Sequence, residues 1–401
     1  MATFLCLASY FKGEDFIKQL KADGNTVFLV TSKILENKPW PVDSIDEIFY
    51  IQENEKLNWN LDHLIMGTAA LLVKHEIDAV VALDDFDIAM AASLREAFRI
   101  NGMGLTTARY FRDKLAMRTR GLQMGIKVPA FSPLFNDDIV NSFLSENQAP
   151  WLIKPRGEAS AVGIEICHNP EEVWNVINAL GNERHNYLIE AFITGQVYHV
   201  DSLSFDKKAI FTQVSKYLET PMKVAHEGGI FRTKTLAEKD LHTKKLKLIN
   251  QELLEAFGMR YSASHAEFIY KEEEDAFYFV EIASRVGGAH ISEMIEAASG
   301  INMWAEWARI EDHAIKNINY SLPSLKKLQA GLIISLSKQS DPDYSFINPS
   351  EVVWTLKKEH HIGIIIVDKN VQVVDNLIEK YTTIIENDYF TSAPKSNSHS
   401  L

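Results

Sequence analysis

The chain has 401 residues, 46% of them hydrophobic and 24% charged, which is typical of a globular protein with two or three domains. Its formal net charge of −13 disfavours nucleic acid or an anionic membrane as a general partner. No apolar run approaches the roughly 18 residues that a membrane-spanning helix needs. The two cysteines, Cys6 and Cys167, show no metal-binding spacing, and a reduced, cytoplasmic environment fits them.

The first hundred residues alternate between strands and helices. Residues 4–8, 27–30 and 79–83 are short apolar runs typical of buried strands, whereas residues 61–74 have helical periodicity. Strands separated by helices predict a parallel, doubly wound sheet. Residues 1–103 are therefore expected to form an N-terminal α/β domain.

Three acidic residues, Asp84, Asp85 and Asp87, follow the strand predicted at 79–83. Ligands gather at the carboxyl ends of parallel strands, so these acids could contact a substrate. Acids in a solvated loop explain the pattern equally well, and both interpretations stay open. The turn at residues 8–13 lacks the Gly-x-Gly-x-x-Gly pattern, and the chain contains no Gly-x-x-x-x-Gly-Lys-Ser/Thr loop. A dinucleotide oxidoreductase is therefore not indicated.

From residue 150 the pattern changes to short strands closed by turns, which predicts a small α+β subdomain. Lys154 ends the first of these strands and precedes a loop of small residues that reaches Gly163. Such an arrangement could lay a cation and backbone amides over phosphates, although a surface loop without a ligand is the alternative. Glu190 ends another apolar strand and could read the edge of an adenine ring together with backbone carbonyls.

The strongest pattern lies between residues 264 and 300. Strands are expected at 264–270 and 277–283, joined as a hairpin by a charged turn, so that Glu267 and Glu281 lie on neighbouring strands. Strict alternation places Glu281 on the same side as Phe279. Two facing carboxylates would repel each other unless a cation lay between them, and Mg²⁺ with phosphate oxygens meets that need.

Arg285 follows the second strand of this hairpin and could make a bidentate phosphate contact. Gly287 and Gly288 then lead into a predicted helix, whose N-terminus could aim backbone N–H groups at an anion. A hairpin with exposed acids and a glycine turn is the alternative for each residue alone. The order of all these residues together favours a metal–phosphate site.

Together, these segments resemble the ATP-grasp superfamily, in which two α+β subdomains close on ATP. The resemblance runs from about Gly102 to Asn302 and implies a parallel α/β N-terminal domain followed by an ATP-grasp fold of two α+β subdomains. Beyond residue 322 we expect strands at 332–336 and 363–367 and a weaker one at 370–374. The expected domains are 1–103, a linker with the first ATP-grasp helices at 104–149, a small lid subdomain at 150–205, a large subdomain with the metal site at 206–321, and a C-terminal α+β region at 322–401.

The resemblance also implies ATP and Mg²⁺ as cofactors, with Mn²⁺ as a substitute, and assigns residues to them. The residues implied to bind the nucleotide are Lys114, Lys154, Ser160, Glu190, Phe192, Ile193 and His199, and those implied to bind metal are Glu267 and Glu281. Two positions depart from the family pattern. Ala283 stands where an asparagine usually follows the second metal glutamate, so that one metal could be held less tightly. Val197 replaces the usual acidic ribose contact, which His199 or Asp201 could take over.

The superfamily's shared chemistry implies activation of a carboxylate as an acyl phosphate and attack by an amine, with release of ADP and phosphate. Residues 281–290 resemble carboxylate–amine ligases, and amino-acid and dipeptide ligases are the nearest group. Arg285 would grip the substrate carboxylate, Arg232 would lie in a glycine-hinged loop over the acceptor site, and His290 would act as a base. The partners expected are small carboxylates and amines, with neither nucleic acid nor membrane. Dimers are common among the enzymes that this chain resembles.

Alternatives to this activity remain open at the level of sequence. A biotin-carboxylase-like or purine-biosynthetic ATP-grasp enzyme would share the nucleotide site and differ in its substrate. The loops at residues 9–13 and 84–87 would decide between them. A non-catalytic ATP-binding protein is the alternative from another class, which Ala283 favours weakly and the lysines and glutamates above disfavour.

Overall fold

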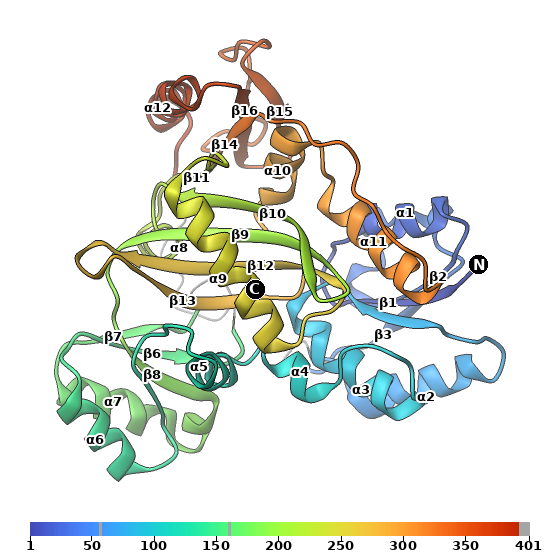
Figure 1. Cartoon of the computed structure of the whole chain (residues 1–401), viewed down its shortest axis with the longest axis horizontal. Coiled ribbons are helices and arrows are strands. Elements are labelled where there is room, and N and C mark those ends of the chain that lie inside the picture. Colours follow the sequence, from blue (N-terminus) through green and yellow to red (C-terminus); the bar gives the residue numbers. More distant parts are fainter. Residues whose placement is uncertain (56–57, 159–161, 393–401) are drawn as a thin grey trace.

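The computed structural model describes residues 1–55, 58–158 and 162–392, and three β-sheets organise this part of the chain (Figure 1). Ser160 lies outside the described residues. No helix within the described ranges is both long enough and apolar enough to cross a membrane. Short 3-10 segments occur at η1 Lys33–Leu35, η2 Val42–Ser44, η3 Asp85–Asp87, η4 Gly181–Asn186 and η5 Glu272–Glu274.

The N-terminal sheet is entirely parallel and has the strand order β3-β2-β1-β4, which confirms the predicted α/β domain. Its strands are β1 Thr3–Ala8, β2 Thr26–Ser32, β3 Glu47–Ile51 and β4 Ala79–Ala82, and its helices are α1 Glu14–Ala22, α2 Leu61–Leu72, α3 Ile88–Phe98 and α4 Leu105–Arg109. Strand β3 was not predicted, although residues 48–51 form a short apolar run, and its side chains are exposed or only half-buried.

A small antiparallel sheet follows, with the order β5-β8-β6-β7. The strands of this sheet are β5 Phe131–Pro133, β6 Trp151–Pro155, β7 Glu165–Cys167 and β8 Tyr187–Ala191. Two helices, α6 Asp137–Glu146 and α7 Pro170–Leu180, lie together on one face of the sheet (Figure 1). Their apolar sides bury Phe143 and Ile177 against Trp151 and Ile153, which gives this unit a core of its own.

The third sheet has eight strands in the order β13-β12-β9-β10-β11-β14-β16-β15. The strands are β9 Gln196–Phe205, β10 Lys208–Tyr217, β11 Phe231–Thr235, β12 Ser262–Lys271, β13 Ala276–Ala283, β14 Gln329–Leu336, β15 Val352–Thr355 and β16 His361–Asp368. The accompanying helices are α5 Lys114–Gln123, α8 Pro221–Glu227, α9 Leu241–Phe257, α10 Ile291–Ser299, α11 Met303–Ile315 and α12 Val371–Asp388. Helix α9 covers one face of the sheet, and α11 packs on the other face, where it also meets α1 of the N-terminal domain (Figure 1).

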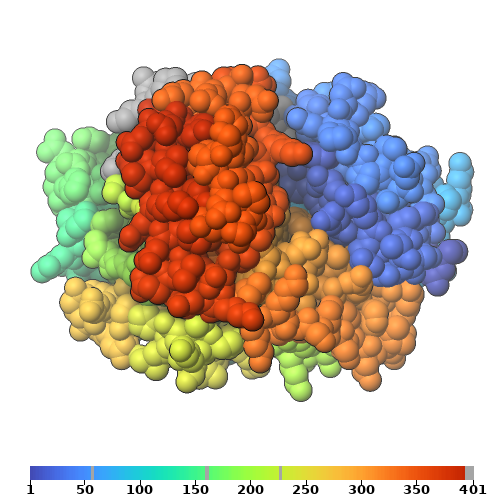
Figure 2. Space-filling view, turned by 90° about the horizontal axis from the view of Figure 1, so that it is seen from above, coloured from blue at the N-terminus to red at the C-terminus, as the bar shows by residue number. Residues whose placement is uncertain are grey.

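The sheets divide the chain differently from the expected domain limits. Strand β5 lies in the range expected to be a linker but pairs with β8 of the small sheet. Strand β9, expected in the lid subdomain, pairs with β10 and β12 of the large sheet. Strands β14 to β16 continue that same sheet, so the C-terminal region is built into the body, and Figure 2 shows its residues covering the near face of the molecule.

One local prediction is wrong, and another holds for only the middle of its range. The weak strand expected at residues 370–374 is the beginning of α12, whose N-cap Asn370 accepts a hydrogen bond from the backbone N–H of Gln372. The glycine-hinged loop expected at residues 226–232 contains the end of α8 and the start of β11. Thr220 caps α8 and Pro221 is its first residue, an arrangement that favours helix initiation.

Candidate active site

A cavity of about 530 Å³ lies where the three sheets meet. The N-terminal domain contributes Asp85 to its wall, the small sheet contributes Lys154 and Glu190, and the large sheet contributes Glu267 and Glu281. Because these residues come from three separate units, the cavity exists only when all three are packed together. It therefore brings together most of the residues that the sequence singled out.

Glu267 and Glu281 are direct cross-strand partners on β12 and β13, as the sequence predicted. The hydroxyl of Tyr217 donates a hydrogen bond of 2.8 Å to Oε1 of Glu267. Lys114 Nζ lies 3.0 Å from Oε2 of Glu281. Burial opposes ionisation of Glu281, but Lys114 outweighs it and lowers the pKa of Glu281 to about 2. Both carboxylates are thus held in fixed positions on the cavity wall.

A β-bulge next to this pair changes which residues share its face. Glu267 pairs with Glu281, but the next residue, Phe268, pairs with Phe279, so Val280 is the extra residue. Phe279 consequently faces the opposite side of the sheet and packs in the core beside α9, against Phe268. The prediction that Glu281 and Phe279 share a side is therefore wrong. The bulge lets an apolar anchor and a cavity carboxylate lie two residues apart in one strand.

The predicted adenine residue Glu190 has a different environment from the one expected. It is 2% exposed, and its carboxylate lies 2.7 Å from Arg118 Nε and 2.8 Å from Lys154 Nζ. Burial opposes its ionisation, but Arg118 and then Lys154 lower the pKa of Glu190. Burial also lowers the pKa of Lys154 to about 8, even though Glu190 favours the charged form. The carboxylate of Glu190 is engaged by two cations, one of which the sequence did not indicate.

Other predicted nucleotide residues lie around the cavity. Phe192 and Ile193 line it beyond β8, and Lys114 lines it from the start of α5, where its Nζ also donates to the carbonyl of Glu158 at 2.5 Å. His199 is fully buried, and its two ring nitrogens lie 2.7 Å from Asp201 Oδ2 and 2.7 Å from the hydroxyl of Thr233. Neither nitrogen is therefore directed at a ribose.

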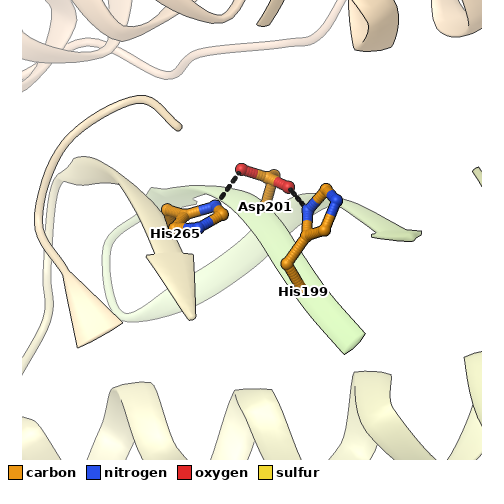
Figure 3. Close-up of side chains that lie close together, drawn as sticks. All are labelled: His199, Asp201 and His265. Carbon is orange, nitrogen blue, oxygen red and sulfur yellow. Dashed lines mark hydrogen bonds and ion pairs between the residues drawn. The ribbon is translucent and has the colours of Figure 1, made fainter. Parts of the chain in front are cut away.

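His199, Asp201 and His265 form a buried cluster on the same face of the large sheet (Figure 3). Each oxygen of Asp201 contacts the Nδ1 of one imidazole, at 2.7 Å for His199 and 2.8 Å for His265. His265 Nε2 in turn lies 3.6 Å from Oε1 of Glu267. Burial opposes protonation of His265, but Asp201 outweighs it and raises the pKa of His265 to about 10. These residue types could hold a metal. Their hydrogen bonds to one another instead indicate a network that orients the carboxylate of Glu267.

The segment after β13 runs directly over this cluster. A Cβ atom at Gly287 would lie 2.7 Å from Asp201 Oδ1 and 3.0 Å from His265 Nδ1, so only glycine fits there. Gly288 and Ala289 follow and line the cavity. The tight approach at Gly287 thus fixes the height of this loop above the sheet.

Arg285 joins the large sheet to the N-terminal domain. Its Nε and Nη2 donate to Oδ2 of Asp85 at 3.0 and 2.7 Å, and its Nη1 donates to the carbonyl of Val286 at 2.8 Å. The other two acids after β4 face local partners: Asp84 pairs with Lys12, and Asp87 accepts from the backbone N–H of Ser9 at 2.9 Å. Of the three acids, Asp85 is therefore the one that belongs to the cavity.

Arg232 and His290 were predicted to lie at the substrate site, but neither side chain faces the cavity. Arg232 lies in β11, where Phe231 lines the cavity and Lys234 pairs with Asp375 of α12. Since side chains alternate along a strand, Arg232 points with Lys234 away from the cavity. His290 borders a neighbouring groove, where its Nδ1 lies 2.7 Å from Glu293 and its ring lies 4.8 Å from that of Trp354.

A search against known protein families matches residues 147–293 to the ATP-grasp domain. The chain contains an ATP-grasp domain. The matched range includes Lys154, Glu190, both paired glutamates and Arg285, whereas Lys114 and Asp85 lie before it. The family resemblance drawn from the sequence is thereby confirmed.

Two sequence relatives match part of this chain. The L-arginine-specific L-amino acid ligase of Bacillus subtilis is 27% identical over 248 residues, which are 60% of this chain and 59% of that relative. The D-alanine–D-alanine ligase of Fusobacterium nucleatum is 25% identical over 193 residues, which are 47% of this chain and 61% of that relative. The chain thus spans about three fifths of the length of these relatives.

Two solved structures resemble this chain along nearly its whole length. The L-amino acid ligase from Bacillus licheniformis superposes with a TM-score of 0.73 at 14% identity, covering 98% of this chain and 99% of its own. The N5-carboxyaminoimidazole ribonucleotide synthetase from Thermus thermophilus superposes with a TM-score of 0.71 at 13% identity, covering 98% and 100%. At such identities the likeness concerns the fold, which confirms the predicted fold class.

Proposed function

We propose that the protein is an ATP- and Mg²⁺-dependent ligase that activates a carboxylate as an acyl phosphate and joins it to an amine, with amino acids as substrates. The observation that carries this proposal is the cross-strand pairing of Glu267 with Glu281 in one cavity with Lys114, Lys154 and Arg285. The ligase names of the sequence relatives support the choice of substrate class. ADP and phosphate are the other products.

The proposed reaction assigns a task to three cations of the cavity. An amine cannot displace oxide from a carboxylate, but it can displace phosphate from an acyl phosphate that the γ-phosphoryl group of ATP has formed. Such a transfer needs positioning and charge neutralisation more than a covalent protein nucleophile. Lys114 and Lys154 would hold phosphate oxygens, and Arg285 would hold the carboxylate that is to be phosphorylated.

The two paired glutamates fit Mg²⁺, because they offer neighbouring carboxylate oxygens, the ligands that this ion prefers. When bound, Mg²⁺ would neutralise charge on the phosphates. Tyr217 and Lys114 would keep the two carboxylates oriented. We assign one ion to this pair, since Ala283 removes the amide that family members usually add. Mn²⁺, which accepts similar oxygen ligands, would serve as a substitute.

A second candidate is a biotin-carboxylase-like or purine-biosynthetic ATP-grasp enzyme, which the fold similarity to the Thermus thermophilus synthetase favours. Such an enzyme would share the nucleotide site and replace the amino acid by another acid or amine. We propose a cytoplasmic location in either case, which suits the two buried free thiols, Cys6 and Cys167.

The proposal is tested by incubating the purified protein with ATP, Mg²⁺ and pools of the twenty L-amino acids while ADP, phosphate and AMP are measured. We expect ADP and phosphate in equal amounts, released faster when amino acids are present, together with a new amide product. Glu281→Gln should abolish this release, whereas Glu273→Gln, a matched change in the exposed turn of the same hairpin, should not. Absence of substrate-stimulated ADP release would contradict the ligase, and AMP with pyrophosphate would indicate adenylation instead.

A further inference from the structure

Arg112 is a cation of the cavity wall that has no anionic partner within the described ranges. The lysine and arginine side chains that line the cavity there are Arg112, Lys114, Lys154 and Arg285. The last three are paired with carboxylates of the same wall. No hydrogen bond or ion pair joins the guanidinium of Arg112 to another described residue. The side chain is half-buried and its nitrogen atoms keep accessible surface, so a molecule in the cavity can reach them.

An aromatic ring holds this guanidinium in place. The central carbon of the Arg112 guanidinium lies 4.0 Å from the centroid of the Phe86 ring. Phe86 in turn packs against Tyr10, with the two ring centroids 5.1 Å apart. A guanidinium over a ring has one face covered, so its N–H groups are left to donate in its own plane. A carboxylate accepts two such parallel hydrogen bonds, which makes it the anion that best fits this arrangement.

Arg112 lies beside the residues that we assign to the first carboxylate. Phe86 directly follows Asp85, whose Oδ2 accepts two hydrogen bonds from Arg285. Two consecutive residues of η3 therefore hold the two arginines, one through an ion pair and the other through a ring. The paired glutamates of the proposed metal site belong to β12 and β13 of the large sheet. Arg112 thus contacts the N-terminal domain, at the side of the cavity where that domain supplies residues to the wall.

A ligase that joins two amino acids must also hold the carboxylate that is not activated. The amino acid that supplies the amine keeps its carboxylate, which becomes the free end of the product. We propose that Arg112 binds this carboxylate of the acceptor amino acid and thereby directs the amine toward the carboxylate activated at Arg285. The carboxylate at Arg112 is unchanged by the reaction. This inference rests on the proposed function and specifies the acceptor as an amino acid with a free carboxylate.

The charges of the cavity wall make such a cation necessary. The wall already contains four carboxylates, those of Asp85, Glu190, Glu267 and Glu281. A further carboxylate would be repelled by them unless it met a positive charge that no wall carboxylate engages. Arg112 supplies that charge. Lys12, in the neighbouring loop, is already paired with Asp84.

The test compares the wild-type protein with Arg112→Met, Arg112→Lys and Arg260→Met. Arg260 is the matched control, because its guanidinium also lies over a ring, that of Tyr261 at 5.2 Å, but its side chain is 58% exposed at the surface. The substrates are the amino-acid pair most active in the pooled assay, with the acceptor given either as the free acid or as its carboxamide. The carboxamide has no carboxylate to activate, so it can act only as an acceptor. Mass spectrometry quantifies the dipeptide and the dipeptide amide at saturating ATP and saturating activated amino acid.

We expect the wild-type protein to favour the free-acid acceptor about 10- to 100-fold in kcat/KM, because the carboxamide cannot form the charged pair. Arg112→Met should lower kcat/KM for the free acid by a similar factor and change that for the carboxamide less than about threefold. Arg112→Lys should retain part of the preference, since it keeps the charge without the planar fork, and Arg260→Met should retain all of it. The KM for ATP should stay within about twofold in each variant.

The two acceptors separate recognition from structural support. Equal losses for both acceptors in Arg112→Met would overturn the inference, because Arg112 would then only support the packing around Phe86. A KM for ATP that rises as much as the KM for the acceptor would overturn it as well and would assign Arg112 to a phosphate group. A wild-type protein that uses both acceptors equally well would overturn this inference alone. Absence of amino-acid-stimulated ADP release from the wild-type protein would contradict the proposed function, and the inference with it.

Discussion

Replacing Glu190 by glutamine removes the negative charge that contacts both Arg118 and Lys154. The three side chains are 2%, 0% and 5% exposed, so water cannot compensate for the lost charge. The glutamine oxygen can still accept one hydrogen bond, but the two buried cations would lose the anion that they share. Breaking a buried ion pair from one side typically costs about 3–5 kcal/mol. We expect the free energy of unfolding of Glu190→Gln to fall by that amount.

The measurement is urea-induced unfolding, followed by tryptophan fluorescence and by far-UV circular dichroism. Glu165→Gln, which changes an exposed residue of β7 in the same small sheet, serves as the matched control and should alter stability by less than about 0.5 kcal/mol. A loss below about 1 kcal/mol for Glu190→Gln would refute the reasoning, because it would mean that solvent or another anion already screens the two cations. A change of the denaturant slope would show that the variant unfolds in separate steps.

Four further outcomes follow from the site. Burial lowers the pKa of Lys154 to about 8, so kcat/KM for ATP should fall as the pH rises through about 8 and this lysine loses its charge. The free energy of unfolding should rise between about pH 8 and 10, because in that range the unfolded chain binds a proton that the folded chain does not. Gly287→Ala should lower kcat at least about tenfold, since its Cβ would lie 2.7 Å from Asp201 Oδ1. Tyr217→Phe should raise the Mg²⁺ concentration needed for half-maximal activity about tenfold, because it frees Glu267 Oε1. Removal of divalent metal with EDTA should stop ADP release, and excess Mg²⁺ should restore it.

Three of these outcomes have a control variant in the chain. Lys154→Arg should flatten the pH profile of kcat/KM, since arginine keeps its charge throughout this range. Gly67→Ala, at a glycine of α2 with no atom near its added Cβ, should leave kcat unchanged. Tyr278→Phe removes a hydroxyl from the exposed end of the hairpin and should not alter the Mg²⁺ requirement. Equal effects of a variant and its control would contradict the corresponding assignment.

The sequence predicted those features that local patterns determine. Apolar runs marked β1, β2 and β4, and the alternation around Glu267 and Glu281 correctly placed these residues on neighbouring strands. The alternation of residues could not reveal the bulge at Val280. An inserted residue gives no local signal when the residues on both sides of it have the polarity that an unbroken strand would show at those positions. The cap formed by Thr220 and Pro221 was a readable signal for α8 that the glycine pair behind it obscured.

Local sequence patterns could not predict contacts between residues that lie far apart in the chain. Arg118 lies 72 residues from Glu190, and Asp85 lies 200 residues from Arg285. A charged residue on a predicted helix or loop is usually solvated, so nothing in the neighbourhood of Arg118 or Asp85 marked either as buried. Their partners follow from the packing of three sheets, which only the tertiary structure provides.

The region of homology and the unit that folds are not the same in this chain. Residues 147–293 expressed alone would lack Arg118 and Lys114. Glu190 would then keep one of its two cations, Lys154, and Glu281 would lose its contact with Lys114. Strand β8 would lose β5, and β11 would lose β14, which would leave two open strand edges. Open edges invite pairing between molecules, so the excised segment should aggregate instead of binding nucleotide.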